Sequence, residues 1–79
     1  MRKPLADHVA AEVRAELARR SMTWAQLAAA LQKSEMWVSR RLREGAPQEI
    51  SLTELEGIAG VLDLPATEFL PEQPQAAAS

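Results

Sequence analysis

The sequence predicts one compact all-α domain of five short helices. Apolar residues recur at helical spacing in five segments, at residues 5–20, 24–31, 35–43, 52–62 and 65–70. Capping boxes, Gly and Pro separate these segments, and none of them shows the apolar–polar alternation of a strand. A length of 79 residues fits a single domain, which we place at residues 1–70. Residues 71–79 (PEQPQAAAS) contain little that could be buried and are expected to form a disordered tail.

The first two helices are expected to pack through apolar stripes. Leu5, Val9, Val13 and Leu17 recur every fourth residue and place one such stripe on residues 5–20. The sequence Thr23-Trp24-Ala25-Gln26 fits a capping box and predicts a helix beginning at residue 24. Residues 32–34 then form a turn, so the second and third helices lie close together in the chain.

The third helix, residues 35–43, has few apolar positions. Ser34 is a good N-cap, and Gly45 is expected to end the helix. Val38 and Leu42 lie one turn apart and must form the buried seam. Arg40 then points nearly opposite to that seam, which leaves the outer half of this helix free of packing duties.

The fourth helix is predicted from a second capping box. Ser51 is the N-cap of this box and Glu54 is its third helical residue. Ile50 and Leu55, on either side of the box, are placed to pack on each other as a hydrophobic staple. This helix is expected to cover residues 52–62. Leu64-Pro65 opens a last short helix, which is expected at residues 65–70.

The charge of the chain is strongly segregated. All nine Lys and Arg lie within residues 1–45, against five acidic residues, which gives that part a net charge of +4. Residues 46–79 contain six acidic residues and no Lys or Arg, a net charge of −6. A molecule with one basic end can present that end to a polyanion even though its overall charge is −2. Chance segregation in a short chain is the alternative.

Composition argues against several classes of function. The chain has no cysteine and a single histidine, His8, which disfavours a metal site and a nucleophile–histidine site. No apolar run approaches the ~20 residues of a membrane span, and the N-terminus lacks a secretory pattern. We therefore expect a cytoplasmic protein that is not an enzyme and that uses no cofactor.

Residues on the outer half of the third helix can read base edges in a major groove. Arg40 can bind guanine bidentately, Ser39 can bond to several bases, and Met36 can contact a thymine methyl group. Glu35 can accept a hydrogen bond from cytosine, or it can simply favour the positive end of the helix dipole. The predicted base contacts are therefore Glu35, Met36, Ser39 and Arg40.

Contacts to phosphate are expected around this face. Candidates in and after the turn are Lys33, Ser34, Arg41 and Arg43, since cations and helix N-termini bind phosphate. The backbone N–H groups near Thr23 and Trp24 could hold another phosphate. Trp37 could lie along the DNA backbone, or it could fill the joint between the second and third helices.

Three segments resemble the Xre and lambda-repressor family of the Cro and cI type, in a form found among actinobacterial and phage regulators. Met22–Leu31 (MTWAQLAAAL) resembles the first half of its helix-turn-helix, and Trp37–Leu42 (WVSRRL) resembles the second half. Leu52–Pro65 with Glu68-Phe69-Leu70 resembles the fourth helix and the entry to the fifth.

The resemblance implies a five-helix domain that binds operator DNA, with Ala28 packed against the recognition helix and base contacts at positions 35, 36, 39 and 40. Two residues depart from the family pattern. Gln32 stands where the family usually has Gly, so this turn requires a non-Gly residue in a left-handed conformation. Arg41 stands where the family usually has an apolar residue, which bears on the rotation of the third helix.

Together these features predict a sequence-specific regulator of transcription, a repressor of the phage-immunity kind, that inserts residues 35–43 into the major groove of double-stranded DNA. It is expected to act as a homodimer on a palindromic operator, with the acidic half away from DNA and supplying the self-association surface. Two alternatives stay open. One is an antitoxin whose acidic half binds a toxin, and the other is a protein-interaction module that does not bind DNA.

Overall fold

The computed structural model describes residues 4–71, which form four α-helices and one short 3₁₀ helix with no strand among them. The elements are α1 (Pro4–Arg19), α2 (Trp24–Leu31), α3 (Glu35–Leu42), α4 (Leu52–Val61) and the 3₁₀ helix η1 (Ala66–Phe69). The all-α prediction is confirmed for this part of the chain. Except for Pro71, the predicted tail at 71–79 lies outside the described residues.

The last element differs from the α-helix expected at residues 65–70. It is a 3₁₀ helix of four residues, and no side chain caps its start at Pro65. Leu70 has an extended backbone (φ −99°, ψ 151°) and precedes Pro71. Because a residue before proline is disfavoured in the α region, the segment has no room for a full α-helical turn.

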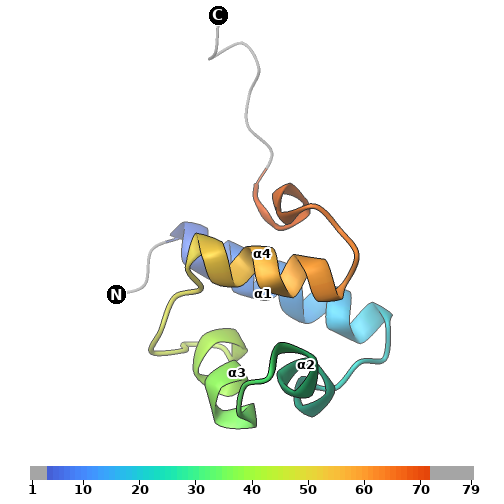
Figure 1. The fold of residues 1–79 in the computed structure, drawn as a ribbon. Helices are drawn as coiled ribbons and strands as arrows, with labels where there is room; N and C mark the ends of the chain where they lie inside the picture. Colours follow the sequence, from blue (N-terminus) through green and yellow to red (C-terminus); the bar gives the residue numbers. More distant parts are fainter. Residues whose placement is uncertain (1–3, 72–79) are drawn as a thin grey trace, which may run out of the picture.

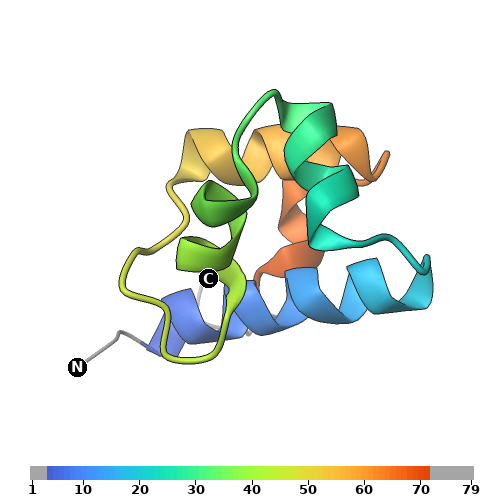
Figure 2. The ribbon, with the colours of Figure 1, turned by 90° about the horizontal axis from the view of Figure 1, so that it is seen from below.

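The helices pack in two layers with η1 on the outside. α2 and α3 lie side by side against one side of the pair α1 and α4, and η1 lies on the other side (Figure 1). Within that pair, α1 and α4 run alongside each other (Figure 2). Figure 2 shows from below that α2 and α3 both lie over the space between α1 and α4. No helix among residues 4–71 combines the length and the apolar character needed to cross a lipid bilayer.

One buried cluster joins all five elements. It contains the expected apolar positions of the first helix from Val9 onward, together with Leu27, Ala28, both seam residues of α3, the inner face of α4 and Phe69. Leu5, which the periodicity placed in the same stripe, is instead 53% exposed. The burial of Ala28 agrees with the tight packing that the resemblance implied.

Each of the predicted N-terminal caps is present. The Thr23 and Ser51 side chains accept hydrogen bonds from the backbone N–H groups of Gln26 and Glu54, and both capping boxes are complete. The Ser34 hydroxyl accepts from the N–H of Trp37 at 3.0 Å. Since each cap satisfies N–H groups that the helix leaves unpaired, the starts of α2, α3 and α4 are determined locally.

Three helices end with a non-Gly residue in the left-handed conformation. Ser21, Gln32 and Asp63 have φ values of 54°, 59° and 59°. After α2, the N–H of Gln32 bonds to the carbonyl of Ala29 and that of Lys33 to the carbonyl of Ala28, which is the Schellman pattern. The prediction that Gln32 adopts a left-handed conformation is confirmed.

The end of α3 differs from the predicted glycine cap. The helix stops at Leu42, Arg43 is extended, and Gly45 takes its positive φ of 69° within the following loop. Arg14 on α1 donates a hydrogen bond to the carbonyl oxygen of Leu42. A cation at the C-terminal end of a helix also favours the helix dipole, so a side chain from α1 supplies the cap that the local sequence lacks.

Candidate nucleic-acid interface

Helix α3 is attached to the core through a narrow seam. Val38 and Leu42 are each 1% exposed and are the buried residues of this helix. They pack with α1 and α2 residues in the central cluster. The predicted seam is therefore confirmed, and the opposite half of α3 faces solvent.

The four predicted base-contacting residues lie on the accessible part of α3. Glu35, Met36 and Arg40 are exposed, and Ser39 is half-buried. Met36 is 59% exposed, so its apolar side chain is accessible to another molecule. The structure brings the four together on one short helix, and their contact with bases stays a prediction.

Three cations at this end of the molecule are exposed: Lys33, Arg40 and Arg43. Within residues 4–71 none of them forms an ion pair. Their availability matters because a cation already neutralised by a carboxylate gains less from a phosphate. These three cations are therefore available to an anionic group of another molecule.

The two arginines at the end of α1 are neutralised instead. Arg19 Nη2 and Arg20 Nε contact the two carboxylate oxygens of Glu16 at 2.6 and 2.7 Å. Hydrogen bonds from Arg20 and then Arg19 lower the pKa of Glu16, and the same contacts raise the pKa of Arg19. These side chains therefore form a local ion-pair group away from α3.

Arg41 does not present its guanidinium as the phosphate-contact prediction assumed. Its side chain is 13% exposed and pairs with Glu54 on α4, with Nε 3.1 Å from Oε1. Nη1 donates to the carbonyl oxygen of Trp37 at 3.1 Å, and the guanidinium lies 3.9 Å from the centroid of the Trp37 ring. We accordingly leave Arg41 out of the set of phosphate contacts.

Partial burial acts to raise the pKa of Glu54, but two hydrogen bonds outweigh it. The backbone N–H of Ser51 and the guanidinium of Arg41 both donate to this carboxylate, and its pKa lies below the ordinary value. Glu54 is thus held as an anion beside Arg41.

Both tryptophans are half-buried against the core. For Trp37 this favours the joint-filling interpretation, and Lys33 Nζ lies 5.6 Å from its ring centroid. Trp24 shares its helix with the buried Leu27 and Ala28. Their expected contacts with the DNA backbone stay predictions.

The capping atoms limit which groups could bind phosphate. The Thr23 backbone N–H donates to Gln26 Oε1 at 2.8 Å within the capping box, so this donor is occupied. The Ser34 hydroxyl accepts a hydrogen bond from the N–H of Trp37 but keeps its own proton for another acceptor. The N–H of Trp24 belongs to the first turn of α2, where helical N–H groups have no intrahelical partner.

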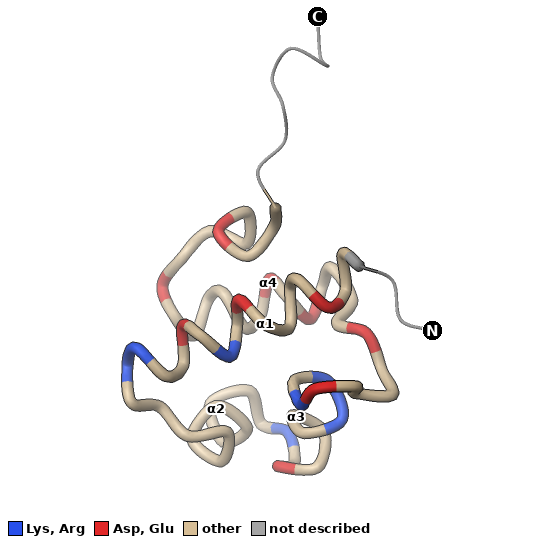
Figure 3. The backbone as a smooth tube through the Cα atoms, turned by 180° about the vertical axis from the view of Figure 1, so that it is seen from behind, with Lys and Arg blue, Asp and Glu red and all other residues tan. Residues whose placement is uncertain are grey.

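Charge is distributed unevenly over the fold (Figure 3). Lys and Arg positions lie on α3, in the turn before it and on α1, whereas α4 and the segments after it carry only acidic charge. Two acidic residues, Glu35 and Glu44, flank α3 and moderate its positive character. Among residues 4–71, α1 thus carries charges of both signs, and cations are absent from α4 and the segments after it.

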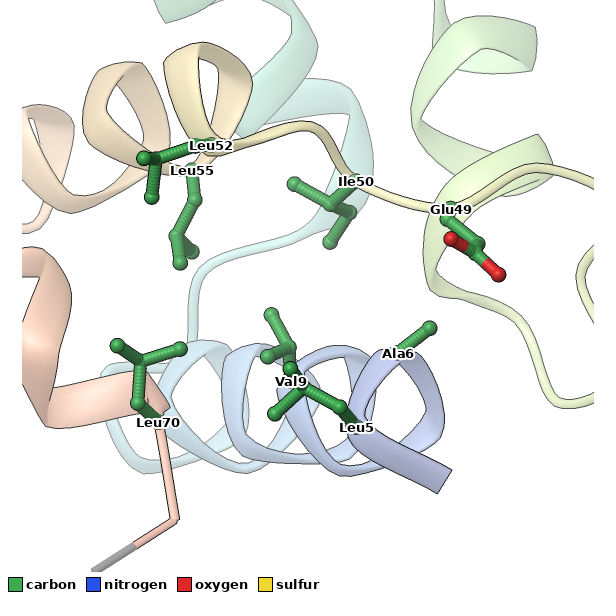
Figure 4. A pocket seen from close by; sticks show the side chains of 8 residues that line it. All are labelled: Leu5, Ala6, Val9, Glu49, Ile50, Leu52, Leu55 and Leu70. Atoms are coloured by element: carbon green, nitrogen blue, oxygen red, sulfur yellow. The ribbon is translucent and has the colours of Figure 1, made fainter. Parts of the chain in front are cut away.

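A second surface of note is an apolar hollow of about 270 Å³ between the starts of α1 and α4 (Figure 4). Leu5, Leu52 and Leu70 line it and are 53%, 66% and 36% exposed. Ile50 and Leu55 point into the same space from the side of Leu52, opposite Leu5 and Leu70 (Figure 4). Three of the four large exposed hydrophobic side chains of the described chain gather there, and the fourth is Met36.

Two functional neighbours of α3 were not found by sequence reasoning. Arg14 had no predicted role and Glu54 was assigned only to a capping box, yet they bond to Leu42 and Arg41 of α3. For Glu54 a signal existed, because Arg41 stands where the family that the sequence resembles usually has an apolar residue, and a half-buried arginine needs an anion. No local pattern pointed to Arg14.

The α3 surface therefore combines a narrow buried seam, an exposed methionine and three exposed cations without ion-pair partners among residues 4–71. This arrangement suits contact with a polyanion that has an apolar component. Searches of protein-family models, curated proteins and solved structures give no match to this chain.

Proposed function

We propose that this protein is a sequence-specific regulator of transcription that binds double-stranded DNA by placing α3 in the major groove. One observation carries the proposal. Two buried side chains attach α3 to the core, and its opposite face is exposed. That face presents Met36 and Arg40, and the cations Lys33, Arg40 and Arg43 form no ion pair within residues 4–71. The major groove is about 12 Å wide and an α-helix with its side chains is about 10–12 Å in diameter, so a helix can enter the groove. The face that contacts the bases must then be free of packing within the protein.

In this proposal α2, the turn at residues 32–34 and α3 form a helix-turn-helix. Two short helices joined by a left-handed Gln32 support this, as does the resemblance of both helices to the Cro and cI type. The N-terminal end of α3 would enter the groove first, since recognition helices contact bases through their early residues. Repression is the expected outcome, because a bound domain of this size blocks other proteins from its site.

The side chains have distinct proposed tasks. Arg40 reads guanine, Met36 contacts a thymine methyl group, and Ser39 and Glu35 supply the remaining base contacts. Lys33 and Arg43 bind phosphates and fix the register of the helix. Trp24 and Ser34 offer a backbone N–H and a hydroxyl to the same strand.

Selection from a random duplex library by the full chain is the direct test. We expect an enriched motif, with affinity for random duplex that falls with salt at a log–log slope of about −0.9 for each phosphate contacted. An antitoxin would also enrich a motif but would bind a toxin through its acidic surface. Failure to enrich any motif, together with salt-independent behaviour, would favour a module that does not bind DNA.

The same proposal includes a homodimer on a palindromic operator with half-sites about one helical turn apart. The apolar hollow is the surface we expect to join the two copies, because exposed apolar patches on small domains mark interaction sites. Leu5→Ser should weaken self-association in sedimentation experiments. Met36→Ser removes the exposed methionine outside the hollow and should leave self-association unchanged, which makes it the matched control.

A further inference from the structure

The attachment of α3 has a mechanical weakness. Val38 and Leu42 lie one turn apart on the same side of the helix, nearly in a line along its axis. Two contacts in a line hold a helix down but resist rotation about that line only weakly. The half-buried ring of Trp37 packs on the core beside this line. A rotation of α3 would carry Met36, Ser39 and Arg40 sideways, and a displacement of about 1 Å is enough to misplace a hydrogen-bonding group.

One network lies to the side of this line. Arg41 donates from Nε and Nη2 to the two oxygens of Glu54 on α4 at 3.1 and 3.3 Å, and from Nη1 to the Trp37 carbonyl. Its guanidinium is also stacked 3.9 Å from the Trp37 ring centroid. The planar fork of arginine is thereby fixed in orientation at all three nitrogens.

Glu54 is itself held in place. Its Oε1 accepts the backbone N–H of Ser51 at 3.0 Å in the capping box of α4, while Arg41 binds the same carboxylate. The Ser51 hydroxyl in turn accepts the backbone N–H of Glu54 at 3.1 Å. The bridge therefore runs from α3 to the capped first turn of α4, which is a rigid anchor.

We propose that Arg41 and Glu54 are positioning residues that set the rotation of α3, and so determine sequence discrimination without touching DNA. The inference rests on the proposed DNA-binding function. It assigns Arg41 a role opposite to that of a phosphate ligand. It also accounts for a charged side chain that is only 13% exposed at a position where the resembled family has an apolar one.

Glu54→Gln distinguishes a phosphate ligand from a positioning residue, because the two roles of Arg41 predict different changes in DNA binding. If Arg41 were a phosphate ligand restrained by Glu54, neutralising Glu54 would strengthen binding to every duplex. As a positioning residue, Glu54→Gln should instead lower the ratio of affinities for the selected site and random duplex, on the order of threefold to tenfold. The capping box should survive, because Gln26 plays the same part in α2.

Two further variants complete the experiment with the full chain. Glu56→Gln removes the same charge from an exposed residue of α4 and should leave the ratio unchanged. Arg41→Lys keeps the charge but loses the bidentate and stacked geometry, and should lower the ratio as Glu54→Gln does. Because the two residues act as one unit, the double variant should lose no more than either single one.

The outcomes are distinguishable. A lowered ratio in Glu54→Gln and Arg41→Lys, with non-additivity and an unaffected Glu56→Gln, supports the inference. If Glu54→Gln merely behaves like Glu56→Gln, or Arg41→Lys is tolerated, the inference is overturned while the proposed function stands. Absence of any preferred site for the wild-type chain overturns both.

Discussion

Helices α3 and α4 begin in the same way and then diverge. Each follows a serine N-cap whose hydroxyl accepts the N–H three residues later. α4 then buries Leu55, Ile58 and Ala59, whereas α3 buries only Val38 and Leu42. The exposed residues of α3 are Glu, Met and Arg, whereas those of α4 are Leu, Thr, Glu and Gly and include no cation.

The contrast shows how a small domain can divide its work between similar helices. α4 packs on the core through the broader inner face, which buries Leu55, Ile58 and Ala59. α3 has a narrower inner face, and two arginines add polar contacts to it: Arg14 from α1 bonds to the Leu42 carbonyl, and Arg41 bonds to Glu54 on α4. A helix that uses little of its surface for packing keeps most of it for another molecule.

The largest effect should come from comparing one leucine on each helix. Leu42 on α3 is 1% exposed and Leu52 on α4 is 66% exposed. Leu42→Ala should lower the free energy of unfolding by about 2–5 kcal/mol, because it removes buried surface and leaves a cavity. Leu52→Ala should change it by less than about 0.5 kcal/mol in urea denaturation of dilute protein. Equal losses would mean that α3 is anchored elsewhere.

The outer face of α3 should respond in DNA binding and not in stability. Arg40→Ala is expected to cost about 1–3 kcal/mol on the selected site and to relax the preference at one base pair. Arg43→Ala should weaken binding to all sequences alike and flatten the salt slope by about one. Binding assays at several salt concentrations measure both. An unchanged footprint for Arg40→Ala would contradict the groove placement.

The left-handed positions around α3 should show effects of opposite sign. Gly45 has φ +69°, and an added Cβ would meet nothing within 4 Å, so Gly45→Ala tests conformation alone. It should destabilise the fold by about 1 kcal/mol. Gln32→Gly removes the strain of a non-Gly residue at φ 59°. The greater conformational entropy of glycine in the unfolded chain offsets part of that gain, so the net stabilisation should be about several tenths of a kcal/mol. Thermal unfolding measures both changes.

The smallest effect concerns the bridge between the two helices. The pKa of Glu54 is lowered in the folded chain, so its stabilising contribution is complete above the ordinary carboxyl pKa and is lost as pH falls through the lowered value. Glu54→Gln should therefore cost at most about 1 kcal/mol near pH 7, and the difference from wild type should shrink at acidic pH. In an Arg41→Ala background the pH-dependent part should diminish. If the stability difference between wild type and Glu54→Gln grew at low pH, Glu54 would not be stabilising the fold as an anion.

Sequence reasoning reached most of the fold. The starts of α2, α3 and α4 were predicted to the residue, because each depends on a cap within three positions. The seam of α3 followed from periodicity and is confirmed. The burial of Leu5 was predicted wrongly, because it depends on how much of another element covers the start of α1. The last helix was predicted too long, because Leu70 is extended before Pro71.

The candidate site was predicted less completely than the fold. The exposure of Glu35, Met36 and Arg40 follows from their angle to the seam, which is a local property. The state of Arg41 does not follow in this way, because its position on the helix permits either solvent or a partner. The occupied N–H of Thr23, by contrast, was already implied by the predicted capping box, in which the Gln26 side chain accepts it.

The sequence by itself determined the helices, their caps, the left-handed turn at Gln32 and the segregation of charge, because these depend on neighbours within a few residues. Only the tertiary structure decided which arginines are available. Arg41 meets Glu54 across 13 positions, and Arg14 meets Leu42 across 28. Periodicity gives the side of a helix on which a residue lies, whereas the group that it meets there depends on how the helices pack.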